Sequence, residues 1–257
     1  MNKTYLFRYF LKNAVYSLLF WVAAVVILFE FLSSFILKLD QMNQRMVLDQ
    51  LYFNLYLVGL FLAPALGIIA GRVLVVKESQ VLLSHQLSRR AFYLMSFIFH
   101  GLILFLVWLA VVLIFLGVSH FYNQPITADL LVRLGLSFFA LLLPFLWAGF
   151  LAVIFKPATV IIVYLLLFAS LPRIVSQIDK PDNTAARQTM TAILKAVTVV
   201  IPNIHPYQLV SSSFASSAKS STGVNLDWFG YGLLWTAVLG LGGFLIFQRK
   251  DLADPHS

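Results

Sequence analysis

The stretch AFYLMSFIFHGLILFLVWLAVVLIFLGV, residues 91–118, decides the class of fold that this chain can adopt. It contains no Asp, Glu, Lys or Arg, and its most polar side chain is a single histidine. An α-helix needs about 20 apolar residues to cross the roughly 30 Å of hydrocarbon in a bilayer, and this run is longer than that. We therefore predict a membrane-spanning helix here.

The rest of the chain has the same character. Its 257 residues are 61% hydrophobic and 11% charged, whereas a soluble domain carries roughly a quarter charged residues. We predict an all-α, polytopic membrane protein with a single domain, residues 1–257, and six transmembrane helices. The six spans are residues 14–37, 51–71, 91–118, 130–155, 158–175 and 228–247. Pro157 suits the first turn of the fifth span, where its missing N–H costs nothing.

The basic residues predict the orientation of these spans. The net charge is +8, and Lys and Arg in short connections mark the cytoplasmic side of a membrane protein. If both termini are cytoplasmic, ten of the 18 Lys and Arg residues fall on the cytoplasmic face. They are Lys3, Arg8, Lys12, Arg72, Lys77, Arg89, Arg90, Lys156, Arg249 and Lys250. We therefore expect both termini to be cytoplasmic and the protein to lie in the inner membrane. No basic stripe with interleaved aromatics occurs, so we expect no nucleic-acid partner.

The sequence lacks the motifs of several membrane enzymes. No Gly-Lys pair is followed by Ser or Thr, so a phosphate-binding P-loop is absent, and none of the five histidines belongs to a His-Glu-x-x-His motif. There is no cysteine. We predict no catalytic residue, no metal ligand and no cofactor bound by this chain.

Two polar residues lie deep enough in the predicted spans to be functional candidates, Glu30 in the first and His100 in the third. Ionisable groups inside a membrane are costly, so each is a candidate contact for a proton or a substrate. The alternative is a packing role, with Glu30 bonded to a neighbouring helix or reaching outward and His100 hydrogen-bonded in the core. We favour packing for both. Arg133 is near the outer end of the fourth span, where we expect its side chain to extend to the interface.

A translocation path could use residues of the second and fifth spans. The candidates are Tyr52, Phe53, Tyr56, Pro64 and Tyr164. The three aromatics at the outer end of the second span would also fit an interfacial belt. Pro64 and Gly67 predict either a hinge or close packing of small residues. Five glycines in the last span suggest tight helix contact.

The segment between the second and third spans differs from its surroundings. Written as a helix, residues 74–88 gather Leu82, Leu83 and Leu87 loosely on one side, with polar residues away from it. Such a helix would lie on the cytoplasmic membrane surface and could act as a lever on both spans; an ordinary interfacial connector is the alternative. The extracytoplasmic loop, residues 173–227, includes an apolar piece, residues 191–202, which predicts a re-entrant or interfacial helix before span six.

The sequence VKESQVLLSHQLSRRAFYLMSFIFHGLI, residues 76–103, resembles the signature of ATP-binding-cassette exporter permeases of the type-2 class. In that family a Glu-containing cytoplasmic stretch leads into Leu-Leu-x-x-x-(Leu/Ile)-(Ser/Gly)-Arg. The matching residues are Glu78, Leu82, Leu83, Leu87, Ser88 and Arg89. The sequence FQRKDL, residues 247–252, is similar to the basic-Asp-Leu ending of these permeases, and IPNIHPYQL, residues 201–209, to an outer-loop element. Ser79-Gln80 replaces the Gly-Thr that is common in the family, and Gln86 a common Pro.

The resemblance implies the permease subunit of an ATP-driven exporter, not an enzyme in its own right. It implies two copies of a separate ATPase subunit that carry ATP and Mg²⁺, a second permease chain, identical or homologous, and contact with membrane lipids. The expected coupling residues are Lys77, Glu78, Ser79, Leu82, Leu83, His85, Leu87, Ser88, Arg89 and Arg90. The cargo would be lipid-like, otherwise hydrophobic, or a small molecule. The alternative is an envelope-complex scaffold or mechanotransmission subunit that moves no substrate. It would support the maturation of a periplasmic protein or metalloenzyme, with a periplasmic partner bound at residues 173–227.

Overall fold

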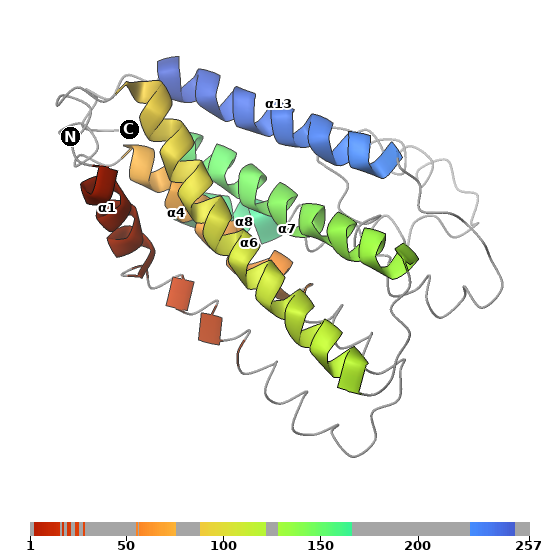
Figure 1. Cartoon of the computed structure of the whole chain (residues 1–257). Helices are drawn as coiled ribbons and strands as arrows, with labels where there is room; N and C mark the ends of the chain where they lie inside the picture. The colour runs from red at the N-terminus through yellow and green to blue at the C-terminus, as the bar shows by residue number, and fades with distance from the viewer. Residues whose placement is uncertain are drawn as a thin grey trace, which may run out of the picture.

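The structure is a computed structural model that describes residues 3–15, 57–75, 88–121, 128–165 and 227–249, together with positions 17, 20, 21, 24, 25, 28 and 55. In this part of the chain every regular element is a helix (Figure 1). The helices are α1 (Lys3–Val15), η2 (Val58–Leu62), α4 (Ala63–Val75), α6 (Arg89–Phe121), α7 (Ala128–Ile154), α8 (Pro157–Tyr164) and α13 (Asp227–Arg249). The element η2 is a π-helical turn that continues directly into α4.

Four helical stretches of the described chain are long and apolar enough to cross a membrane. They are Val58–Val75, Arg89–Gly117, Leu134–Ile154 and Phe229–Arg249. The predicted all-α fold is confirmed for the described residues, and these four stretches, which by length and composition suit a membrane protein, correspond to the second, third, fourth and sixth predicted spans. Pro157 begins α8, as expected for the fifth span. Most of the first span and residues 166–175 of the fifth lie outside the described residues.

The predicted lever segment, residues 74–88, differs from the structure at its first two residues. Leu74 and Val75 continue α4, and the side chain of Leu74 is fully buried. The second span therefore extends past its predicted end at Gly71, because its apolar sequence continues into the core. Ser88 precedes the first turn of α6. Residues 76–87, which hold most of the expected coupling residues, lie outside the described chain.

The centre of the protein is the pair α4 and α7, which approach each other through glycine. A Cβ atom on Gly67 would overlap the carbonyl oxygen of Phe145, and one on Gly71 would overlap that of Gly149. Gly67 and Gly71 form a G-x-x-x-G pattern, which allows two helices in a membrane to pack backbone against backbone. Of the two alternatives for Gly67, hinge or close packing, the structure supports close packing.

The helices α6 and α13 lie outside this central pair (Figure 1). Most of the Val58–Val75 span is buried within the protein, at 78%, whereas 17% of Phe229–Arg249 is buried. The glycine prediction for the last span is only partly confirmed. A Cβ on Gly243 would contact the Tyr93 hydroxyl at 2.5 Å, but Gly230 and Gly240 face open space. The number of glycines does not indicate which side of the helix meets a neighbour.

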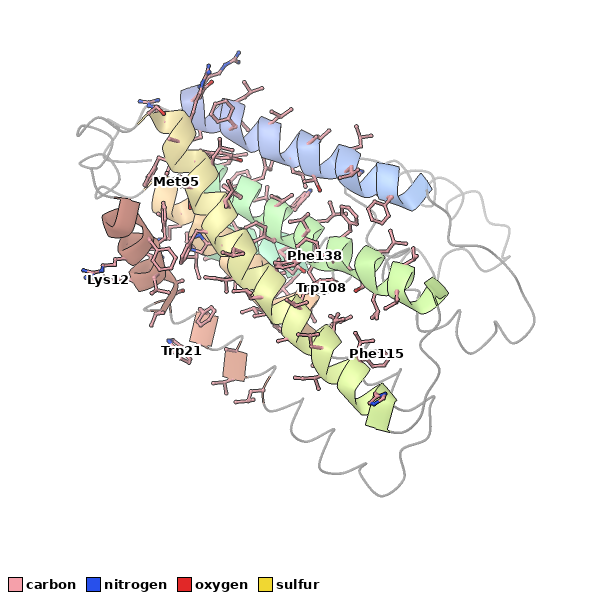
Figure 2. The ribbon with its side chains drawn as sticks, viewed as in Figure 1. Lys12, Trp21, Met95, Trp108, Phe115 and Phe138 are labelled. Carbon is pink, nitrogen blue, oxygen red and sulfur yellow. The ribbon has the colours of Figure 1, made fainter. Side chains whose placement is uncertain are left out.

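Hydrogen bonds join α6 to both central helices. The Ser96 hydroxyl donates to the carbonyl of Ala70 on α4, at 3.0 Å. Further along α6, the Trp108 indole N–H donates to the hydroxyl of Ser137 on α7, at 3.1 Å. Figure 2 shows Trp108 beside Phe138, with ring centroids 5.4 Å apart. These bonds hold polar groups inside an apolar bundle without leaving them unpaired.

Candidate functional site

The first turn of α6 begins at the residues that end the family-like motif. The backbone N–H of Ala91 donates to the Ser88 hydroxyl at 3.2 Å, and that of Phe92 to the Ser88 carbonyl at 3.1 Å. Serine is a preferred residue at this position because its side chain satisfies an N–H group that the helix itself leaves unpaired. Ser88 is thus the N-cap of α6.

Arg89 joins the start of α6 to the end of α13. Its guanidinium Nη1 donates to the backbone carbonyl of Gln248, at 2.9 Å. Gln248 is the penultimate residue of α13, where carbonyl groups have no helical donor and the helix dipole is negative. A cation is therefore well suited to this place, and the bond is charge-assisted.

Two neighbours of Arg89 make further contacts with α13. The hydroxyl of Tyr93, one turn along α6, donates to the carbonyl of Gly240 at 3.0 Å. The exposed guanidinium of Arg90 lies over the ring of Phe244, with its Cζ atom 6.0 Å from the ring centroid. Aromatic contacts between Tyr93 and Phe247, at 6.0 Å, complete this junction. The ends of the two outer helices are thus tied at several points.

Most basic residues of the described helices lie at this end of the bundle, whereas Arg133 belongs to the start of α7 at the opposite end. The rings of Phe10 and Phe92 lie 5.6 Å apart, which places α1 beside the start of α6, and Gly71 packs on Ala152 near the ends of α4 and α7. Figure 2 shows Lys12 directed away from the other helices. The basic residues at this end whose side chains the structure describes are Arg8, Lys12, Arg72, Arg89, Arg90, Lys156 and Arg249. The described acids, Asp129 and Asp227, belong to the first turns of α7 and α13 at the opposite end (Figure 1).

Two candidates for the translocation path, Pro64 and Tyr164, meet at one backbone carbonyl. The N–H of Ala63 bonds to the carbonyl of Val58, five residues back, in the π-helical turn. In the same pattern the carbonyl of Gly59 would pair with residue 64, but a proline has no N–H to donate. The Tyr164 hydroxyl donates to the Gly59 carbonyl instead, at 2.9 Å. Because Tyr164 is buried, this hydrogen bond stabilises the packing of α8 against the π-helical turn.

His100 belongs to α6, and its ring lies in the core against α1. Its side chain is fully buried, and its ring meets those of Phe10 and Phe99 edge-on, at 6.1 and 5.3 Å. The Nδ1 atom lies 2.8 Å from the Ser96 carbonyl, which can only accept, so Nδ1 carries the proton. No described residue donates to Nε2. The geometry agrees with a packing role and does not test a role in proton transfer.

Several predicted site residues fall outside the described chain. They are Glu30, Tyr52, Phe53, Tyr56, Lys77, Glu78, Ser79, Leu82, Leu83, His85 and Leu87. Within the described ranges, no group of three His, Cys, Asp or Glu residues could hold a metal ion. Gln248 was not among the predicted site residues, because it acts through its backbone carbonyl and its side-chain type carries no signal for that contact.

Comparison of the chain with protein-family models, with curated proteins and with solved structures found no match.

Proposed function

We propose that this chain is the membrane permease subunit of an ATP-driven exporter of the ATP-binding-cassette type-2 class. The observation that carries the proposal is the hydrogen bond from Arg89 to Gln248. This bond joins Arg89, the last residue of the motif at residues 78–89, to Gln248, which belongs to the family-like ending at residues 247–252. The two bonded residues are 159 positions apart in the sequence. Two stretches that carry the resemblance therefore meet at one junction.

The junction suits the transfer of force from a cytoplasmic partner. In the proposed mechanism, residues 76–87 dock on the ATPase as the coupling segment, and Glu78 anchors it through a charge-assisted hydrogen bond. Movement of that segment reaches α6 directly through its N-cap, Ser88, and reaches α13 through Arg89. Two permease chains and two ATPase subunits would form the complex, with ATP and Mg²⁺ on the ATPase.

The charge distribution supports the proposed orientation. Seven basic residues lie at the Arg89 end of the described helices and Arg133 lies near the opposite end, and the positive-inside rule assigns the more basic end to the cytoplasm. Both termini would then be cytoplasmic, and the membrane would be the inner membrane of a cell with an envelope. The cargo would be hydrophobic, lipid-like or a small molecule.

The proposal is tested by purifying the full-length chain from its host membranes together with its companions. We expect a nucleotide-hydrolysing subunit in the complex, and we expect Leu83→Asp and Arg89→Gln to abolish the stimulation of its ATPase activity in vesicles. Arg249→Gln is the matched control, because Arg249 is an exposed arginine at the same end of the bundle. All variants must insert and elute as the unmodified chain does.

A complex without any nucleotide-hydrolysing subunit would refute the proposal. Unchanged ATPase stimulation in both Leu83→Asp and Arg89→Gln would remove the coupling role of this segment. Loss of stimulation in Arg249→Gln as well would show that the charge of this end, and not the Arg89 contact, is what matters.

A further inference from the structure

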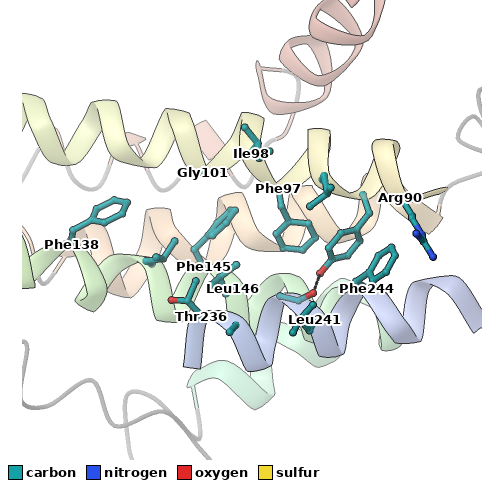
Figure 3. A pocket seen from close by; sticks show the side chains of 15 residues that line it. Arg90, Phe97, Ile98, Gly101, Phe138, Phe145, Leu146, Thr236, Leu241 and Phe244 are labelled. Carbon is teal, nitrogen blue, oxygen red and sulfur yellow. Dashed lines mark hydrogen bonds between the residues drawn. The ribbon is translucent and has the colours of Figure 1, made fainter. Parts of the chain in front are cut away.

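An elongated apolar groove lies between α6, α7 and α13, with a volume of about 650 Å³ (Figure 3). It is lined by the first half of α6, the middle of α7 and the second half of α13. Its lining is almost wholly hydrocarbon, and the hydroxyl of Thr236 is already bonded to the Gly232 carbonyl at 2.8 Å. The Tyr93 hydroxyl in the lining likewise donates to the Gly240 carbonyl, so beyond Arg90 at one end the groove favours an apolar occupant.

The groove has the length of one bilayer leaflet. Its α6 wall extends from Arg90 to Gly101, and Figure 3 shows Arg90 and Phe138 at its two ends. Eleven residues of helix rise about 16 Å at 1.5 Å per residue, and half of a hydrocarbon core of about 30 Å is about 15 Å. A chain that enters at Arg90 would reach the bilayer midplane at the inner end.

The rim of the groove faces the region where lipid lies around the bundle. Leu94, Ile98 and Leu241 line it and are 54%, 65% and 62% exposed, respectively. Because α6 and α13 are the outer helices of the described bundle, these side chains meet acyl chains in a membrane. A lipid can thus enter sideways without any rearrangement of the helices.

Arg90 supplies charge complementarity at the entrance. Its guanidinium is exposed and lies over Phe244, and among the described residues no carboxylate pairs with it. A guanidinium at headgroup depth binds phosphate through paired N–H donors, and the other basic residues at this end favour lipids with net negative charge.

We propose that the groove binds one acyl chain of an anionic phospholipid, with the lipid phosphate on Arg90. The site requires only that α6 and α13 span the membrane, so it is independent of the ATPase and of the proposed export function. Its lipid would come from the leaflet at the basic end of the bundle.

The site is tested with the full-length chain in phosphatidylcholine nanodiscs that contain phosphatidylglycerol with a photoreactive group midway along one acyl chain. We expect crosslinks on the groove walls of α6, α7 and α13. Native mass spectrometry should show about five-fold stronger retention of phosphatidylglycerol than of phosphatidylcholine, as expected for one basic contact. Arg90→Gln should remove this preference, and Arg249→Gln should keep most of it.

A second pair of variants tests the groove itself. A Cβ on Gly240, which lines the groove, meets no atom within 4 Å, so the helix backbone can accept a side chain there, and we expect the larger side chain of Gly240→Leu to occupy part of the groove. We expect this variant to lower crosslinking of the groove about five-fold. Gly230→Leu is the control, because Gly230 lies on the same helix, also faces open space and does not line the groove.

Three results would overturn the proposal. The first is crosslinks spread evenly over the exposed faces of the bundle, and the second is crosslinking that Gly240→Leu leaves unchanged. The third is a dimer in which a helix of a second copy covers Leu94, Ile98 and Leu241. Retention that does not distinguish the two lipids in the unmodified chain would remove the headgroup contact with Arg90.

Discussion

Replacing Tyr164 by phenylalanine removes the hydroxyl that donates to the Gly59 carbonyl and leaves the ring in place. A buried acceptor left without a partner costs about 1–3 kcal/mol, whereas interhelical hydrogen bonds in membrane proteins contribute about 0.6 kcal/mol on average. We expect a loss in unfolding free energy of about 1.5 kcal/mol, because Pro64 has no N–H that could replace the lost donor.

The same geometry predicts coupling between Tyr164 and Pro64. The variant Pro64→Ala restores an N–H in the turn that precedes α4, so the carbonyl of Gly59 gains a backbone donor. In that background Tyr164→Phe should cost only about 0.5 kcal/mol, which is the ordinary value for such a bond. The double-mutant cycle should therefore give a coupling energy of about 1 kcal/mol.

The assay is reversible unfolding of the purified chain in mixed micelles with a rising fraction of sodium dodecyl sulfate, followed by the fluorescence of its five tryptophans. Tyr93→Phe is the matched control. Its acceptor, the Gly240 carbonyl, lies inside the regular helix α13 and keeps a backbone donor, so the cost should be close to 0.6 kcal/mol. The assignment of an unpaired carbonyl to the Pro64 turn is wrong if Tyr164→Phe costs the same in both backgrounds.

Three further predictions concern packing, the buried histidine and orientation. Gly67→Ala places a Cβ against a backbone carbonyl of α7 and should destabilise the chain by about 1–3 kcal/mol, whereas Gly135→Ala, in open space, should stay within about 0.5 kcal/mol in the same unfolding assay; equal effects would contradict the close packing. His100→Leu removes a buried nitrogen without a donor among the described residues, so the unfolding free energy should fall by no more than about 1 kcal/mol; a loss beyond 3 kcal/mol would point to a partner outside the described chain. Because the chain has no cysteine, a membrane-impermeant maleimide added outside intact cells should label His120→Cys and not Ser88→Cys, both exposed positions, and the opposite result would reverse the proposed orientation.

The long apolar runs predicted most of the described fold. Hydropathy locates the helices of residues 91–118, 130–155 and 228–247 to within a few residues, because a membrane helix must keep its whole length apolar. Proline rules placed Pro157 in the first turn of α8. The end of the second span was set too early, since hydropathy falls at Arg72 while the helix continues through the buried Leu74.

The contacts between helices were less predictable. Glycine counts indicate that helices pack closely somewhere, but Gly67 and Gly71 meet a backbone while Gly230 and Gly240 meet nothing. That difference depends on the rotation of each helix about its axis, which small residues alone do not fix. The Arg89–Gln248 bond was beyond prediction for another reason: its acceptor is a backbone carbonyl, which every residue carries.

The contacts divide the described helices into a close-packed pair, α4 and α7, and an outer pair, α6 and α13. This division affects how a displacement of Ser88 would be transmitted to the other helices. The helices α4 and α7 meet backbone to backbone at Gly67 and Gly71, so a shift between them meets hard overlap within a fraction of an ångström. The outer helices α6 and α13 are tied to each other at one end by Arg89 and Tyr93, and beyond this junction the groove lies between them, with α7 forming one of its walls. A displacement of the start of α6 would therefore act on α13 and on the groove between the two helices, while the α4–α7 contact resists it. If the proposed function holds, the first structural change driven by the ATPase would occur at the groove between α6 and α13, and not at the α4–α7 contact.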